Sequence, residues 1–380
     1  MCQNNSYLLI AGDLVPTKKN ENFFSQGNID AFFDNDFKGL WTKASYRIFN
    51  LETPLSEHSK YLDKAGVLLG AKTATFNGIE KLLPDLVCLA NNHILDLEKK
   101  GALDTIELLE KSQINYIGIG KNINEMKDHQ LYTYNDKRIC IYNCCEHEFT
   151  YATTDKFGTN PFNPLTSLFR IQALKNECDY LIVIYHGGKE LYQYCTPKLQ
   201  EICHSISNAG ADLIVCQHSH CIGCYEKFKN STIVYGQGNF IFDVDEDGLW
   251  NELTKEGLFI KLNLNDFSIE FVEYYKDNGI LKLRDFSINN GFYTRSLQIK
   301  DNEFVKERYI NEIEHTSFHY FRQILSTKYL GFIDKKFLGA YFMKKRYKKL
   351  RLLLINYLDC EVHYENILTY LKEIKELNKS

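Results

Sequence analysis

Apolar runs alternate with amphipathic runs over the first 243 residues of the chain. Continuous apolar runs bounded by polar residues are typical of buried strands, whereas apolar positions three and four apart are typical of helices. The pattern predicts strands at 7–13, 46–52, 85–93, 114–120, 138–143, 179–188, 211–220 and 231–243, and helices at 98–112, 165–177 and 197–210. Strands that alternate with helices in this way indicate an α/β domain with a buried sheet.

The pattern changes in the last third of the chain. Residues 257–285 have the alternation of paired strands that would extend the sheet, whereas the residues after about 295 have the spacing of helices. No linker rich in proline or glycine separates the two parts. We therefore predict an α/β domain at 1–290 and a C-terminal helical appendage at 291–380 that packs on it.

Composition narrows the class of protein. The hydrophobic content of 44% and charged content of 25% are ordinary for a globular chain. A net charge of -4 gives no overall attraction to nucleic acid, so no nucleic-acid partner is expected. The N-terminus lacks the pattern of a signal peptide, and no apolar run reaches the roughly 20 residues of a transmembrane helix. These features predict a cytoplasmic protein whose 12 cysteines are mostly free thiols.

Residues that can bind metals follow several of the predicted strands. Any one of them alone could be a strand-end cap or a loop residue, but sites of α/β proteins collect at the carboxyl ends of strands. The set offers carboxylate, amide and imidazole ligands, including a carboxylate that could bridge two ions. We therefore predict two divalent ions (Mn, Fe or Zn) held by Asp13, Glu52, Asn92, His186, His218 and His220.

Two further residues predict the chemistry of this site. Metal ions lower the pKa of a bound water and clamp a transferring phosphoryl group. His93, beside the candidate ligand Asn92, is placed to protonate the leaving group, and Asp96 could orient His93 and raise its basicity. The expected catalytic residues are therefore His93 and Asp96.

Six sequence blocks, in order over residues 7–243, carry a family resemblance. They are "AGDL", "NLETPLS", "LANNHILDLEKKGALDTIELL", "YHGGKE", "AGADLIVCQHSHCIGCYE" and "IVYGQGNFIFD". In this order and context the chain resembles the CapA family of capsule and poly-γ-glutamate synthesis proteins, within the calcineurin-like metallophosphoesterase superfamily. The resemblance implies a four-layer α/β/β/α sandwich, here followed by the C-terminal helical appendage.

The resemblance also implies a role for each candidate residue. Asp13 and His220 would hold one metal, and Glu52 would bridge to a second metal held by Asn92, His186 and His218. Substrate-contacting or supporting roles would fall to Glu190, Glu226 and Asn239. Purely structural roles are equally good interpretations of these residues, as a helix start, a strand cap and a turn respectively. The wider superfamily often has a histidine ligand where this chain has Val15, so the first metal would be held weakly or completed by Glu190 or water.

The resemblance implies a metal-dependent hydrolase that acts on a phosphoester or polymer linkage in capsule or exopolymer (poly-γ-glutamate or polysaccharide) metabolism. A metal-bound hydroxide would attack the electrophilic centre. The alternative is a non-enzymatic metal-binding subunit of a bacterial capsule synthesis or export assembly, which Val15 favours. A nucleotide phosphodiesterase would share the chemistry, but the chain has no basic cleft signature outside its tail.

Two other features remain open. Cys221 and Cys224 form a single C-x-x-C, which we interpret as part of a turn into a strand and not as a zinc or redox motif. Residues 335–351 carry eight basic residues and no acidic one, interleaved with apolar residues. This segment could contact an anionic membrane surface, an acidic polymer or a capsule assembly, or it could be a helix that packs on the α/β domain with its lysines in solvent.

Overall fold

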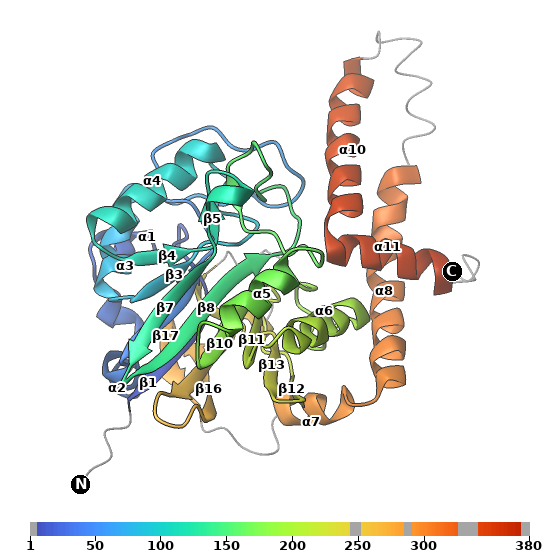
Figure 1. Ribbon diagram of the computed structural model, residues 1–380. Helices are drawn as coiled ribbons and strands as arrows, with labels where there is room; N and C mark the ends of the chain where they lie inside the picture. Colours follow the sequence, from blue (N-terminus) through green and yellow to red (C-terminus); the bar gives the residue numbers. More distant parts are fainter. Residues whose placement is uncertain (1–5, 244–251, 285–290, 326–340, 374–380) are drawn as a thin grey trace.

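Two β-sheets lie face to face in the computed structural model, and helices cover the outer face of each sheet (Figure 1). The structure describes residues 6–243, 252–284, 291–325 and 341–373, of which 315–325, 341–347 and 373 are described by their backbone alone. Within these residues the four-layer α/β/β/α sandwich is confirmed. The C-terminal helical appendage is confirmed as well.

The first sheet is built around strand β1 (Tyr7–Val15), which is buried over its whole length. On one side of β1 lie parallel strands, and on the other lie an antiparallel meander and a short parallel strand. The parallel strands on the first side are β2 (Tyr46–Leu51), β3 (Leu86–Cys88) and β4 (Asn115–Ile117). The second side holds β14 (Asn239–Phe242), β15 (Glu256–Asn263), β16 (Ile269–Asp277) and β17 (Ile280–Leu283).

The second sheet has four parallel strands flanked by an antiparallel strand at each edge. Its order is β12 (Tyr225–Phe228), β13 (Ser231–Tyr235), β11 (Leu213–Gln217), β10 (Tyr180–His186), β8 (Lys137–Cys145) and β7 (His129–Tyr134). A small third sheet joins β5 (Ile119–Gly120), β6 (Met126–Lys127) and β9 (Gly158–Thr159).

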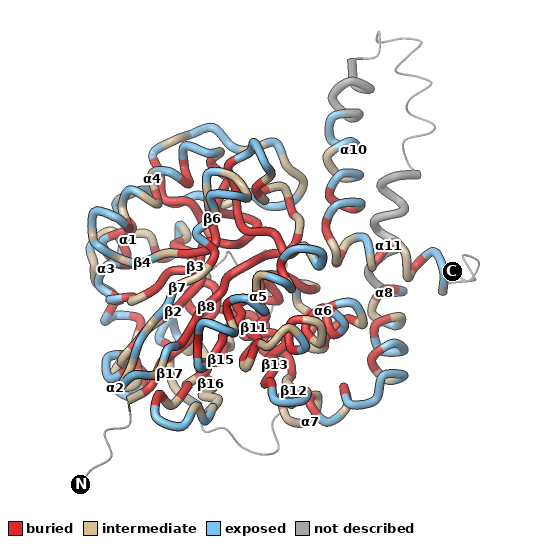
Figure 2. Tube along the Cα trace, in the orientation of Figure 1, coloured by how far each residue is buried: buried red, intermediate tan, exposed pale blue. Residues whose placement is uncertain are grey.

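Side-chain alternation along the strands divides the core into layers. In β1, Leu8 and Ile10 pack between the two sheets, while Leu9 and Ala11 pack against the helices of the first sheet. Successive strand residues point to opposite faces, and both faces of each central strand are covered, so these strands are continuous apolar runs. Figure 2 shows the resulting buried centre.

The helices are amphipathic segments that bury one face against a sheet. The first sheet is covered by α1 (Glu21–Ser25), α2 (Asn35–Lys43), α3 (Phe76–Lys81) and α4 (Glu98–Lys111), and the second by α5 (Ser167–Lys175) and α6 (Pro197–Asn208). Short 3₁₀ turns lie at Ile29–Phe32, Thr73–Thr75, Ile123–Glu125 and Glu252–Lys255. At the start of α6 the Thr196 hydroxyl accepts a bond from Leu199 N, and Pro197 takes the first helical position, where no amide donor is needed.

The C-terminal appendage consists of α7 (Gly291–Gln298), α8 (Asn302–Leu325), α10 (Tyr341–Asp359) and α11 (Glu361–Glu373). Its side chains Tyr309, Ile313 and Tyr370 form a buried cluster with Tyr192 of the α/β domain. In the described residues, no helix combines the length and apolar character that crossing a membrane requires. The domain boundary at residue 290 stays a prediction.

The basic segment predicted at 335–351 is described only in part. Residues 335–340, like the side chains of 341–347, lie outside the described residues. Of the rest, Lys348 forms a 2.5 Å ion pair with Asp63 of the α/β domain. Contact with a membrane or polymer through this segment stays a prediction.

Candidate metal centre

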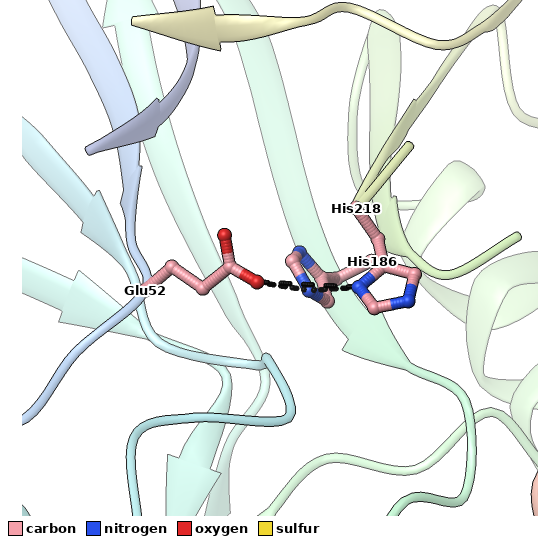
Figure 3. A group of neighbouring side chains, drawn as sticks. All are labelled: Glu52, His186 and His218. Atoms are coloured by element: carbon pink, nitrogen blue, oxygen red, sulfur yellow. Dashed lines mark hydrogen bonds and ion pairs between the residues drawn. The ribbon is translucent and has the colours of Figure 1, made fainter. Parts of the chain in front are cut away.

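The candidate ligands meet where strands of the two sheets end. Asp13 lies on β1, two residues before its end, and Glu52 directly follows β2. His186 is the last residue of β10, and His218 is the first residue after β11. Figure 3 shows Glu52 from the first sheet facing His186 and His218 from the second. The sandwich therefore brings together residues that are far apart in sequence.

A glycine allows the strands to approach closely beside Asp13. A Cβ on Gly12 would lie 1.9 Å from the carbonyl oxygen of Gly238, the residue before β14. No side chain fits at that distance, so glycine is required there. Immediately after this contact, Asp13 is in register with Asn239 of β14 and Asn50 of β2.

Glu52 lies at the centre of the cluster. Its Oε1 is 3.2 Å from His186 Nε2 and 4.0 Å from His218 Nδ1, and its Oε2 is 3.9 Å from His220 Nδ1. Asp13 Oδ2 lies 3.5 Å from the same Nδ1 of His220. Glu52 thus belongs to two potential ligand groups, one with Asp13 and His220 and one with His186 and His218.

Amide side chains complete the inner part of the cluster. Asn92 Oδ1 lies 3.1 Å from His186 Nε2, the atom that also faces Glu52. Asn50 donates a 2.8 Å bond to Asp13 Oδ1, and Asn239 Oδ1 lies 2.9 Å from His220 Nδ1. Asn239 therefore orients a candidate ligand.

The turn after β11 holds both of its histidines in an unusual backbone conformation. The φ angles of His218 and His220 are 86° and 55°. Positive φ is uncommon for residues other than glycine and persists where the surrounding structure imposes it. The turn directs both imidazoles toward Glu52. A regular strand would also place residues 218 and 220 on one face, but it would not require positive φ angles.

The charges of the cluster fit a divalent cation. Burial and the nearby charge of Glu52 raise the pKa of Asp13 to about 7. For Glu52, burial opposes ionisation, but the imidazoles of His220 and His186 hold its pKa well below the usual range. Among the described residues, neither Glu52 oxygen has a hydrogen-bond partner of good geometry. A buried carboxylate of this kind is normally paired or bound to a metal, and the donor set matches Mn, Fe or Zn.

His93 and Asp96 form a buried pair beside the candidate ligand Asn92. His93 Nδ1 lies 2.6 Å from Asp96 Oδ2. A third residue, Lys64, places Nζ 2.6 Å from Asp96 Oδ1 and 2.8 Å from the carbonyl oxygen of Asn92, with its side chain 1% exposed. Sequence reasoning missed Lys64 because it lies in a polar loop with no pattern to distinguish it.

The outer side of His218 faces acidic residues. His218 Nε2 lies 4.0 Å from Glu146 Oε1, and Glu146 directly follows strand β8. Burial raises the pKa of Glu146 to about 8. Glu190, the exposed member of the candidate set, shares a potential ligand group with His218 and His220. Glu146 was missed because the strand was predicted to end at residue 143, whereas β8 continues to Cys145 and Glu146 directly follows it.

The predicted residue Glu226 has its contacts outside the cluster, and Cys221 and Cys224 lie in the core. Glu226 lies on edge strand β12, where its carboxylate is 2.6 Å from His204 Nε2 and 2.5 Å from the Tyr235 hydroxyl. The structure therefore does not bring Glu226 to the cluster, and strand-edge pairing explains its contacts. Cys221 and Cys224 are buried, and burial raises the pKa of the Cys221 thiol to about 12. A protonated, buried thiol is a core residue and not a ready metal ligand.

Comparisons with known proteins give the family. The family described as "Bacterial capsule synthesis protein PGA_cap" matches residues 7–244, and the chain belongs to it. The "Capsule biosynthesis protein CapA" of Bacillus anthracis is 29% identical over 226 residues, which cover 57% of this chain and 54% of that protein. The "PGA biosynthesis protein CapA" of Bacillus subtilis is 25% identical, with 61% of this chain and 62% of that protein covered. The match thus spans little more than half the length of these relatives.

Two solved structures are similar to the chain at low sequence identity. A phosphatase from Mycoplasma pneumoniae is 17% identical, covering 72% of this chain and 94% of its own, with a TM-score of 0.44. The NAD nucleotidase of Haemophilus influenzae is 14% identical, covering 74% of this chain and 53% of its own, with a TM-score of 0.43.

Proposed function

We propose that this member of the capsule synthesis family is a metal-dependent hydrolase that cleaves a phosphoester or polymer linkage in capsule or exopolymer metabolism. The observation that carries the proposal is the buried His93–Asp96–Lys64 group beside the ligand cluster. A cluster that served only to stabilise the fold would not need a histidine with an orienting carboxylate next to it. Catalytic sites do need one.

The proposed ligand assignment follows the distances. Asp13 and His220 would hold one ion, and Asn92, His186 and His218 the other. Glu52 would lie between the two ions because it faces both groups. Bound divalent ions would supply Lewis acidity and a nucleophile at neutral pH. The number and identity of the ions are part of the proposal.

The chain's own residues would orient the substrate and move a proton. Asp96 engages Nδ1 of His93 and so leaves Nε2 as the ring nitrogen for the leaving-group oxygen. Lys64 holds Asp96 from the other side and also binds the backbone carbonyl of Asn92, which couples the histidine to a ligand residue. The enclosed position of the group keeps bulk water from the proton transfer.

A non-enzymatic function remains the second candidate. The chain has Val15, buried on β1, where the superfamily often has a histidine ligand. In that case the protein would be a metal-binding subunit of a capsule synthesis or export assembly that handles an anionic polymer. Two proteins of Mycobacterium tuberculosis that are 24% identical to the chain are named probable polyglutamine synthesis accessory proteins.

Turnover of a generic phosphodiester separates the two candidates. The full chain would be stripped with a chelator, reloaded with Mn²⁺, Fe²⁺ or Zn²⁺, and assayed on bis-p-nitrophenyl phosphate and on γ-glutamyl oligomers. The hydrolase predicts turnover that appears on reloading and is lost on stripping. Metal binding without turnover of any substrate would support the subunit instead.

A further inference from the structure

The C-terminal appendage reaches the candidate metal centre although it lies outside the matched family region of residues 7–244. Helix α11 begins at Glu361, beside the end of β8 where Glu146 lies (Figure 1). The residue before α11, Cys360, is fully buried. The start of this helix is therefore built into the α/β domain.

The loop after β8 is bound to the appendage at two points. Glu361 pairs with His147 twice, through Oε1 to Nδ1 at 2.6 Å and through Oε2 to the backbone N at 2.8 Å. Asp359 accepts a 2.6 Å bond from the Tyr151 hydroxyl. Glu146, which faces His218, is adjacent to the residue that Glu361 holds, so the appendage fixes this side of the site.

The loop after β10 is bound in the same way. Glu365 of α11 accepts bonds from the Thr196 hydroxyl at 2.6 Å and from Lys198 N at 2.8 Å. Glu312 of α8 lies 3.7 Å from Lys189 Nζ, next to Glu190. The apolar cluster of Tyr192 with Tyr309, Ile313 and Tyr370 supports these polar contacts.

Two more contacts involve the remaining sides of the site. Arg295 of α7 donates to the carbonyl oxygens of Ile222 and Gly223, at 2.9 Å and 2.8 Å, just after the His218–His220 turn. Lys348 of α10 pairs with Asp63, next to Lys64. Four separate segments that carry site residues are therefore tied to one C-terminal unit.

Charged residues of the site act on His363 of α11. Burial holds the pKa of His363 below its usual value, and the charges of Glu148 and Glu190 oppose this shift. The charge of His218 acts on it as well. An appendage residue thus shares the electrostatic environment of a candidate ligand.

We propose that the C-terminal helices form the outer wall of the metal centre and limit the size of the group that reaches it. The site would accept a compact phosphoester or the end of a chain, and would exclude the interior of a long polymer. This inference rests on the proposed hydrolytic function. A polymer interior needs a groove open at both ends, yet the candidate ligands of the cluster are buried and Glu190 is the exposed candidate beside them.

The test compares Glu361→Ala with His204→Ala in the full chain. Glu361→Ala removes the bonds to His147, while His204→Ala removes a histidine–glutamate pair of the same 2.6 Å length at edge strand β12. Two esters with one leaving group would be assayed, the p-nitrophenyl phosphodiester of methanol and that of a hydroxyl group midway along a polyethylene glycol chain, which presents a polymer interior. Hydrogen exchange in 146–152 and 187–196, and the rate of Mn²⁺ removal by EDTA, would be measured in parallel.

If the helices form such a wall, the wild type prefers the methyl ester. Glu361→Ala should then raise kcat/KM for the polymer ester, relative to that for the methyl ester, about tenfold, a change typical of altered pocket contacts. Exchange and Mn²⁺ removal would also become faster in this variant and not in His204→Ala. An unchanged ester preference with unchanged exchange would overturn the proposal. If the wild type cleaves neither these esters nor γ-glutamyl oligomers, the proposed function fails, and the exchange and EDTA rates alone decide whether the wall exists.

Discussion

The inner and outer halves of the candidate site are built differently. The inner half consists of candidate ligands at or close to strand ends, so the two sheets and the turns that follow their strands fix their positions. The outer half consists of loop residues such as Lys64 and Glu146. Lys64 binds the carbonyl oxygen of Asn92, 28 positions away, and His147, next to Glu146, is held by Glu361, 214 positions away. The difference suggests that the inner half determines whether metal binds, while the outer half determines what reaches it and how protons move.

Replacing the central carboxylate tests the inner half and should have the largest effect. Glu52→Gln keeps the shape but removes the charge that faces both ligand groups. Replacing residues that only support metal ligands lowers metal affinity by up to about 100-fold. Because Glu52 is itself a candidate ligand, we expect a larger loss of affinity and the disappearance of turnover. Metal content after dialysis would measure this. The control Asp128→Asn alters another buried carboxylate, paired with Arg170, and should retain metal.

Replacing the proposed acid separates catalysis from metal binding. His93→Ala should keep its metal and lose turnover by about 10²–10⁴-fold, the usual value of acid–base catalysis. Its control is His129→Ala, which breaks a histidine–aspartate pair of 2.7 Å elsewhere in the fold. Full turnover of an activated and of a poor leaving group by His93→Ala would show that His93 has no such role.

Lys64→Met tests whether the outer half supports the acid. The change leaves Asp96 buried without its cation, so we expect turnover to fall by about 10–100-fold, as for other supporting residues of metal sites. The loss should be in kcat and not in KM, with a shifted pH–rate profile. Lys175→Met, which removes a 2.6 Å pair with Asp212, should leave the profile in place. An unshifted profile in Lys64→Met would mean that Lys64 only stabilises the loop.

The pH dependence of stability tests how the appendage is held. Burial raises the pKa of Glu365 from 4.5 to about 7. Between these values the folded protein keeps a proton that the unfolded chain has released, so the free energy of unfolding falls as pH rises from about 4.5 to about 7. The contribution is at most about 3 kcal/mol. Glu365→Gln should flatten this part of the profile, measured by urea unfolding of the metal-loaded protein.

The surface variant Glu107→Gln serves as the control for that profile, because Glu107 is 61% exposed in its pair with Lys111. It should follow the wild type. A profile for Glu365→Gln as steep as that of the wild type would contradict the proposed cost of ionising Glu365.

Local patterns predicted most of the fold and the inner half of the site. Strands such as β10 and β11 are continuous apolar runs, and His186 and His218 mark their ends. The sequence did not predict strand β7, whose alternating residues are partly exposed, or helix α2. It also missed Lys64, because its partner Asp96 lies 32 positions away and only the folded loop brings them together.

The role of the appendage was likewise hidden in the sequence. Its helices were predicted from their spacing, but the pairing of Glu361 with His147 depends on how the helices dock. Glu226 illustrates the opposite error, since a motif position suggested a site residue and the strand's direction places it beside His204.

The most direct test of a two-metal centre is the metal stoichiometry of the full chain. The protein would be stripped with EDTA, reloaded with Mn²⁺, dialysed and analysed by mass spectrometry of the metal against protein concentration. The account predicts two ions per chain in the wild type and a marked loss in Glu52→Gln. A wild-type chain that retains no ion after reloading would contradict it.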